Sequence, residues 1–250
     1  MKPHTSYPPP RTSTKAMILA AGLGTRLKPW TDHHPKALAE VNGKSLLQRN
    51  VEYLQQFGIR EVIVNVHHCA DQIWEAIEIN KGWGSIISVS DETTMVLETG
   101  GGLNKASWFF DNGDFVLMNT DVLTNLNIAS MIQYHCVHCP LATLAITNRE
   151  SSRYFLFDDN SNLCGWENIK TGEVKLSKSV EKTHRKAFSG IHIINPSIFS
   201  KISLQGKFSM VDLYLELAKT NQIKGFDHSS SIFIDVGKPE SIVQAEQLFH

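Results

Sequence analysis

A glycine-rich loop that follows a short apolar segment is the feature of this sequence that most restricts its fold. The segment MIL at 17–19 runs directly into AAGLGTR, and Lys36 follows soon after. This order predicts a buried strand that ends in a tight loop, because Gly22 and Gly24 lack a Cβ. Such a loop presents backbone N–H groups to an anion, and Arg26 and Lys36 add positive charge. The stretch 16–41 therefore predicts a phosphate site.

The loop does not fit the two commonest phosphate-binding motifs. The pattern GxxxxGK[ST] is absent, and Leu27 stands where the dinucleotide motif GxGxxG needs its third glycine. GLGTRL followed by Pro29, Thr31, Pro35 and Lys36 instead resembles the sugar-phosphate nucleotidyltransferases, also called nucleotide-sugar pyrophosphorylases. The resemblance covers residues 16 to about 245. It implies an enzyme whose loop surrounds a nucleoside triphosphate.

Composition limits the class of protein. The chain has 250 residues, with 24 Lys and Arg against 25 Asp and Glu, so it has no general positive field for nucleic acid. No apolar run approaches the ~20 residues that span a bilayer, and the N-terminus does not resemble a signal peptide. We expect a cytoplasmic monomer or small homo-oligomer with small-molecule substrates, and neither membrane nor nucleic acid as a partner. Residues 1–14 hold four of the nine prolines and predict a disordered tail.

Apolar periodicity alternates between strands and helices along the remaining chain, 15–250, which we expect to be one nucleotidyltransferase domain. The expected fold is three-layered and Rossmann-like, with a mainly parallel sheet between helices. The segment 149–186 is short and polar, and predicts a small β-rich subdomain over the sugar site. Strands are expected at 17–19, 61–66, 85–89, 115–118, 141–146, 187–194 and 231–236, and helices at 45–57, 71–79, 103–109, 128–136, 210–218 and 239–249.

Two carboxylates are candidates for a metal site. Asp121 follows the apolar run 115–118, and Asp235 ends the run 231–236. Ligands in open α/β sheets gather at the carboxyl ends of strands, although Asp121 could instead cap the next helix. Mg²⁺ takes one or two protein carboxylates, with phosphates and waters completing its shell. The family resemblance matches both residues to metal-holding positions and implies Mg²⁺ as the cofactor.

The resemblance also implies a reaction and its residues. A sugar 1-phosphate attacks the α-phosphorus of the triphosphate, with Arg26 on the β- and γ-phosphates and Lys36 on the α-phosphate as catalytic residues. The positions expected at the nucleotide are Leu19, Ala20, Ala21, Gly22, Gly24, Thr25, Asn65, His67, Glu92, Thr93, Thr99 and Gly100. Those expected at the sugar are Glu98, Asn119, Lys182, Ser189 and Gly190. The glycines 100–102 before an expected helix suggest close approach of a ligand, or alternatively a flexible turn.

Within the family, LETGGG at 97–102, FSGI at 188–191 and the length most resemble members that join UTP to N-acetylmuramate 1-phosphate in peptidoglycan recycling. Alternatives are a guanylyl- or thymidylyltransferase acting on mannose or heptose 1-phosphate, and a non-catalytic nucleotide-sugar sensor. Many relatives hold the sugar phosphate with the Lys of Glu-Lys-Pro. Here Thr183 follows Lys182, so Arg185 or Lys186 could take that place, or the loop could be only solvated.

The segment HCVHC at 135–139 contains potential zinc ligands. It is a single set without a second pair at the spacing of a zinc finger, and structural zinc needs four ligands. The better explanation for these histidines and cysteines is that they are ordinary residues at the end of a helix.

Overall fold

The structure is a computed structural model that describes residues 14–249, so the predicted tail lies outside the described residues except for its last position. The strands are β1 Ala16–Leu19, β2 Glu40–Val41, β3 Lys44–Ser45, β4 Glu61–Val66, β5 Ile86–Asp91, β6 Phe115–Asn119, β7 Val122–Thr124, β8 Ala142–Thr147, β9 Arg153–Phe157, β10 Leu163–Asn168, β11 Glu173–Leu176, β12 His184–Ile194, β13 Ile223–Asp227 and β14 Phe233–Asp235. The α-helices are α1 Leu46–Gln55, α2 Ala70–Ile79, α3 Glu98–Lys105, α4 Ile128–His138, α5 Met210–Leu217 and α6 Pro239–Leu248.

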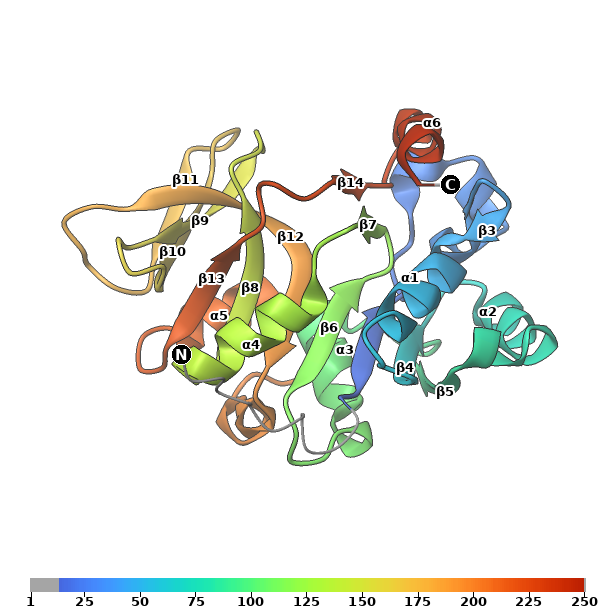
Figure 1. Ribbon diagram of the computed structural model, residues 1–250, viewed down its shortest axis with the longest axis horizontal. Coiled ribbons are helices and arrows are strands. Elements are labelled where there is room, and N and C mark those ends of the chain that lie inside the picture. The colour runs from blue at the N-terminus through green and yellow to red at the C-terminus, as the bar shows by residue number, and fades with distance from the viewer. Residues whose placement is uncertain (1–13, 250) are drawn as a thin grey trace, which may run out of the picture.

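A ten-stranded mixed sheet forms the centre of the molecule (Figure 1). Its parallel part has the order β5-β4-β1-β6. β12 then joins antiparallel to β6, and β9, β10 and β11 extend the sheet beyond it. β8 also pairs with β12 and, in parallel, with β13. The predicted α/β fold with a large, mainly parallel sheet is confirmed, and the antiparallel extension is additional.

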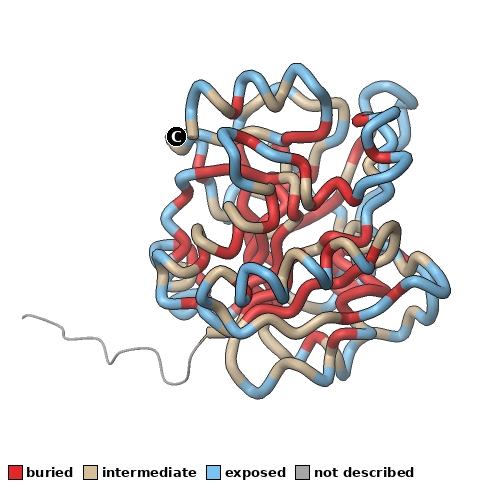
Figure 2. Tube along the Cα trace, turned by 90° about the vertical axis from the view of Figure 1, so that its right-hand side faces the viewer, coloured by how far each residue is buried: buried red, intermediate tan, exposed pale blue. Residues whose placement is uncertain are grey.

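Helices cover both faces of the sheet. Alternate residues of a strand point to opposite faces, so Ile18 and Met17 of β1 enter different apolar clusters. The cluster of Ile18 includes residues of α1, α2 and α4, and that of Met17 includes residues of α3 and α5. Figure 2 shows the buried segments inside and the exposed segments around them. The predicted three-layer arrangement is confirmed.

Two elements differ from expectation. α3 begins at Glu98 rather than at 103, so the three glycines lie inside the helix. They are accommodated there because α3 packs against backbone: a Cβ on Gly101 would lie 2.3 Å from the Gly206 carbonyl oxygen. β14 is not a strand of the large sheet. It pairs with β7 in a separate two-stranded sheet.

Strands β9, β10 and β11 occupy the segment that we expected to be a β-rich subdomain. They form an antiparallel meander whose edge, β11, is exposed along its length. Because β9 also pairs with β12, the meander continues the main sheet. Whether 149–186 acts as a separate subdomain over the sugar stays a prediction.

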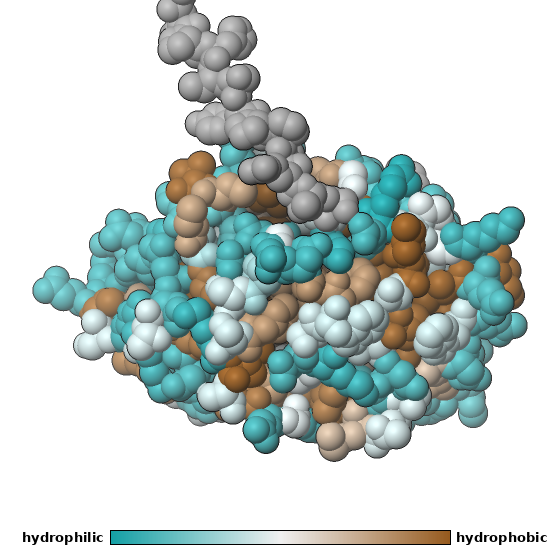
Figure 3. Space-filling view, turned by 90° about the horizontal axis from the view of Figure 1, so that it is seen from below, coloured by the Kyte–Doolittle hydropathy of each residue, from teal (hydrophilic) through white to brown (hydrophobic). Residues whose placement is uncertain are grey.

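The surface is of ordinary polarity on the side seen in Figure 3, where hydrophobic groups are interspersed with hydrophilic ones. Of the helices in 14–249, none has the length and apolar character needed to cross a membrane.

Candidate active site

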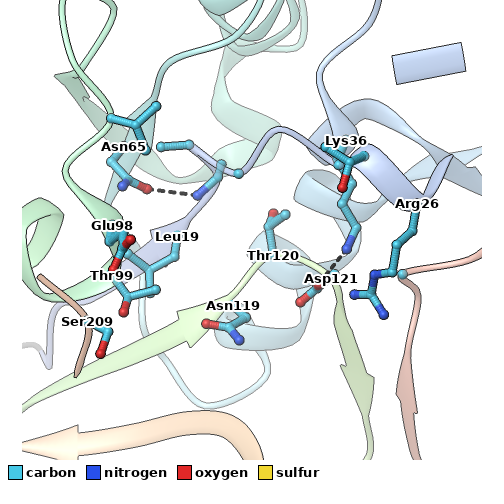
Figure 4. Close-up of a pocket in the computed structure, with 17 residues that line it drawn as sticks. Leu19, Arg26, Lys36, Asn65, Glu98, Thr99, Asn119, Thr120, Asp121 and Ser209 are labelled. Atoms are coloured by element: carbon cyan, nitrogen blue, oxygen red, sulfur yellow. Dashed lines mark hydrogen bonds and ion pairs between the residues drawn. The ribbon is translucent and has the colours of Figure 1, made fainter. Parts of the chain in front are cut away.

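A pocket of about 480 Å³ opens at the carboxyl ends of the parallel strands β1, β4 and β6 (Figure 4). Parallel strands place their carboxyl ends at one edge of a sheet, so residues distant in sequence meet there. Its lining residues are Leu19, Ala20, Ala21, Gly22, Gly24, Thr25, Arg26, Lys36, Asn65, Val96, Glu98, Thr99, Asn119, Thr120, Asp121, Ser209 and Gly237.

The glycine loop is shaped by Gly24. This residue has φ 61° and ψ 29°, a left-handed conformation that glycine adopts readily. A Cβ on it would lie 2.9 Å from both the Cβ of Lys36 and Cγ2 of Thr31. The Thr31 hydroxyl also donates to the Gly24 carbonyl at 2.9 Å. Gly22, by contrast, has no atom within 4 Å of an added Cβ, so its backbone faces open space.

A buried polar chain supports the start of the loop. The Asn65 side chain accepts a hydrogen bond from the Ala20 N–H at 2.8 Å and donates to Glu92 at 2.7 Å. Glu92 is 0% exposed and also accepts from the Leu97 N–H at 3.1 Å. Glu92 does not line the pocket, and its observed role is to hold Asn65. Direct contact with a nucleotide stays a prediction for Glu92.

Arg26, Lys36 and Asp121 line the other end of the pocket, and Asp235 lies next to them without lining it in the described structure. Lys36 Nζ donates to Asp121 Oδ2, and Arg26 Nη2 lies 3.6 Å from Asp235 Oδ1. The small sheet of β7 and β14 brings the carboxylates together, with the Val236 N–H donating to the Asp121 carbonyl at 2.7 Å. Burial, and then the charge of Asp121, raise the pKa of Asp235. An additional cation between them would relieve this repulsion.

This donor set fits Mg²⁺. The described residues contain no group of three or more His, Cys, Asp or Glu side chains that could form a complete protein cage, and this includes 135–139. Mg²⁺ does not need such a cage, since one or two carboxylates with substrate phosphates and waters suffice. Asp121 and Asp235 are therefore the residues that would hold it.

The residues expected at the sugar are only partly brought together. Asn119 lines the pocket, and Gly190 packs directly against it: with φ 73°, a Cβ on Gly190 would lie 2.7 Å from Asn119 Nδ2. Ser189 is 1% exposed, and its hydroxyl lies 2.8 Å from His228 Nε2. Ser189 is thus part of the wall behind Gly190 rather than of the lining. Glu98 lies beside Thr99, away from Arg26 and Lys36 (Figure 4).

The end of the pocket formed by α3 and α5 contains a residue that the sequence analysis did not select, Ser209. Thr99 Oγ1 accepts from the Met210 N–H at 2.9 Å, which fixes α3 to the start of α5. The Glu98 carboxylate lies 3.5 Å from Lys207 Nζ. Besides Glu92, three more residues expected at the nucleotide do not line the pocket: His67, Thr93 and Gly100. A Cβ on Gly100 would meet the Phe208 ring at 2.5 Å, so this glycine serves packing.

The basic residues considered for the sugar phosphate lie near carboxylates elsewhere: Lys182 before β12, and Arg185 and Lys186 near the start of that strand. Arg185 pairs with Glu167, and Lys186 Nζ lies 2.6 Å from Asp227. Lys182 contributes to lowering the pKa of Asp159, so it too lies near another carboxylate. None of the three lines the pocket.

The sequence analysis also missed Thr120, Gly237 and Arg149. Thr120 lines the pocket, and its buried hydroxyl has no hydrogen-bond partner within the described part of the chain. Gly237 lies beneath Arg26, where a Cβ would be 2.3 Å from Arg26 Nη2. The strand motif ending in Asp235-Val236-Gly237 could have indicated Gly237. Thr120 stands between Asn119 and Asp121, which were both selected, so that motif could have indicated it. No motif marked Arg149.

Comparisons with known proteins agree with this geometry. N-acetylmuramate alpha-1-phosphate uridylyltransferase of Caulobacter vibrioides is 29% identical over 92% of this chain and 95% of its own length. The mannose-1-phosphate guanylyltransferase catalytic subunit beta of Drosophila melanogaster is 27% identical over 94% of this chain, which spans 63% of that relative. A crystal structure of HddC from Yersinia pseudotuberculosis superposes with a TM-score of 0.76 at 25% identity, covering 95% of this chain and 100% of that one.

The family model described as nucleotidyl transferase matches residues 15–250. This match includes the glycine loop, both carboxylates and all the residues that line the pocket. The chain belongs to the nucleotidyl transferase family.

Proposed function

We propose that this chain is a sugar-1-phosphate nucleotidyltransferase. A phosphate oxygen of the sugar 1-phosphate attacks the α-phosphorus of a nucleoside triphosphate. The bond from that phosphorus to the bridging oxygen breaks, and pyrophosphate leaves with the electron pair. The observation that supports this most is the meeting of two cation–carboxylate pairs, Lys36 with Asp121 and Arg26 with Asp235, beside one glycine loop.

Catalysis in such a site consists of positioning and charge neutralisation. The attacking phosphate is already ionised, so no general base is needed. We assign Arg26 to the β- and γ-phosphates and Lys36 to the α-phosphate. Mg²⁺ held by Asp121 and Asp235 would neutralise the charge on the transferring group. The loop from Leu19 to Thr25 and the side chains of Asn65 and Thr99 line the remaining pocket, where we place the nucleotide.

We further propose UTP and N-acetylmuramate 1-phosphate as the substrates, and hence a role in peptidoglycan recycling. The segment 97–102 and the 29% identity to a relative of that name support this pair. GTP with mannose 1-phosphate is the second candidate, because relatives named for that reaction are 27% identical over a similar share of this chain.

A pyrophosphate-release assay tests both statements. Each of the four nucleoside triphosphates is combined with N-acetylmuramate, mannose, heptose and glucose 1-phosphates, with Mg²⁺ and with excess EDTA. We expect the highest kcat/KM for UTP with N-acetylmuramate 1-phosphate, and loss of turnover in EDTA. Preference for GTP and mannose 1-phosphate would replace the substrate assignment. Binding of a nucleotide sugar without turnover of any pair would support a sensor and refute the enzyme.

Replacing Arg26 tests its catalytic assignment. Removing one preorganised electrostatic donor costs about 10²-fold in rate, so we expect Arg26→Gln to lower kcat/KM by about that factor. Stability should change little, because the side chains of Arg26 and Asp235 are 54% and 50% exposed and exposed pairs contribute at most about 1 kcal/mol.

Lys28→Gln is the matched control for that experiment. Lys28 is an exposed cation of the same loop that pairs with Asp32 at 2.7 Å and does not line the pocket. Its replacement should leave kcat/KM within about twofold. Equal losses in the two variants would show that the effect of Arg26 is general electrostatics rather than contact with the substrate.

A further inference from the structure

Arg149 is a cation held in a fixed position beside the carboxylate end of the pocket. It lies between β8 and β9. Its Nη1 donates to Thr147 Oγ1 at 3.0 Å and its Nη2 donates to the Phe188 carbonyl at 2.7 Å. The guanidinium carbon lies 4.4 Å from the centroid of the Phe233 ring. Contacts to three separate segments fix the plane of the guanidinium, which is unusual for a long and flexible side chain.

The position of Arg149 is next to the candidate metal ligand Asp235. Phe233 and Asp235 are two residues apart on β14, so their side chains point to the same face of that strand. Burial lowers the pKa of Arg149, while the negative charge of Asp235 raises it. Arg149 in turn counts among the cations that lower the pKa of Asp235. Among the carboxylates of residues 14–249, Asp235 is the one that raises the pKa of Arg149.

The same position is next to the part of the pocket where we expect the sugar. Arg149 donates to the carbonyl of Phe188, and Gly190, two residues further along β12, packs on Asn119 of the lining. Two of the five N–H groups of the guanidinium donate hydrogen bonds to described residues, Thr147 and Phe188. The other N–H groups of Arg149 are therefore left for a ligand.

The other cations considered for this role already have partners. Arg185 is bound to Glu167, and Lys186 lies 2.6 Å from both Asp227 and Asn148. Lys182 acts on Asp159, in the turn between β9 and β10. To reach the pocket, Arg185 and Lys186 would have to leave Glu167 and Asp227. Arg149 does not line the pocket in the described structure either, but it is near Asp235 at the pocket's edge.

We propose that Arg149 binds the phosphate group of the sugar 1-phosphate and so positions the attacking oxygen, an inference that rests on the proposed nucleotidyltransferase function. Mg²⁺ bound by Asp121 and Asp235 would offset the negative charge of Asp235 near Arg149. The guanidinium would then be available to the negative charge of a phosphate group. The flat guanidinium, which lies over the Phe233 ring, would donate its remaining N–H groups to phosphate oxygens.

Steady-state kinetics with both substrates varied tests this proposal. In Arg149→Met, we expect KM for the sugar 1-phosphate to rise at least about tenfold while KM for the nucleoside triphosphate stays within about twofold. Arg149→Lys keeps the charge but loses the fork, so it should recover part of the affinity. Arg153→Met removes an exposed arginine from the start of β9 and serves as the control, with both KM values unchanged.

The possible outcomes separate this inference from the function on which it rests. An active wild type with unchanged sugar-phosphate KM in Arg149→Met overturns the role of Arg149 and leaves the enzyme assignment intact. An equal rise of both KM values also overturns it, because that pattern indicates a structural role. A wild type inactive with every substrate pair overturns both proposals. If thermal melting shows that Arg149→Met does not fold, Arg149→Lys replaces it in the test. A rise in KM for the sugar 1-phosphate alone then supports the proposal, and unchanged or equally raised KM values overturn it.

Discussion

Gly237 shows how a single missing side chain can matter for the site without mattering for the fold. A Cβ there would lie 2.3 Å from Arg26 Nη2 and 2.5 Å from Asp235 Oδ1. Both atoms are at the ends of side chains that can move. We therefore expect Gly237→Ala to unfold at nearly the same temperature as the wild type but to lose at least about tenfold in kcat/KM, since Arg26 must leave its position.

The measurements for Gly237→Ala are pyrophosphate release and a thermal melt on the same preparation. The thermal melt shows whether any loss of activity comes simply from a smaller amount of folded protein. Full activity with an alanine at this position would mean that the place of Arg26 over Gly237 is irrelevant to turnover.

At the scale of single residues, prediction from sequence worked best for side chains whose chemistry suits the proposed site. Asp121, Asp235, Arg26 and Lys36 could be selected because they follow apolar strands and match the motif of the family that the sequence resembles. The structure brings all four together. Arg149 could not be selected, because its place beside Asp235 depends on contacts between β8, β12 and β14 that no local pattern encodes.

The helix α3 illustrates the same limit for an element. Three glycines disfavour a helix by about 1 kcal/mol each, so the sequence predicted a loop before position 103. The helix nevertheless starts at Glu98, because close packing of Gly100, Gly101 and Gly102 against other segments outweighs their low propensity. Strands such as β4, whose observed bounds equal the predicted ones, were found because burial on both faces gives a continuous β-branched run.

Gly101→Ala tests this explanation of α3. Alanine raises helix propensity by about 1 kcal/mol, but its Cβ would lie 2.3 Å from the Gly206 carbonyl oxygen, a backbone atom that cannot rotate away. We expect a net loss of about 1–3 kcal/mol in the free energy of unfolding, measured by chemical denaturation. Asn104→Ala, at a half-buried position of the same helix, is the control and should be neutral or stabilising. A more stable Gly101→Ala would contradict the packing argument.

In the whole molecule, the two parts of the sheet contribute different portions of the site. The parallel part supplies the loop after β1, Asn65 at the end of β4 and Asn119 at the end of β6. β12 of the antiparallel part supplies Gly190, and β14, which pairs with β7 in the separate small sheet, supplies Asp235. The parallel part was predictable from alternating strands and helices. The antiparallel part was not, because strand order across β8, β9 and β12 is set by long-range pairing.

The junction between these parts contains a buried histidine that should make the stability of the whole domain depend on pH. His192 of β12 is 1% exposed, and its Nδ1 lies 2.7 Å from the hydroxyl of Tyr214 on α5. Burial lowers the pKa of His192 from 6.5 to about 3. Between these values the unfolded chain binds a proton that the folded chain does not, so the free energy of unfolding falls as pH decreases.

From about pH 7 to pH 5, this one group should lower the free energy of unfolding by about 2 kcal/mol. His228, whose pKa is lowered to about 4 chiefly by burial, acts in the same direction. Denaturant titrations at the two pH values measure the total. In His192→Gln the loss should shrink by about 2 kcal/mol, because no proton is taken up on unfolding at that position. His138→Gln, at an exposed position, should keep the wild-type difference. An undiminished loss in His192→Gln would mean that His192 is not neutral in the folded domain.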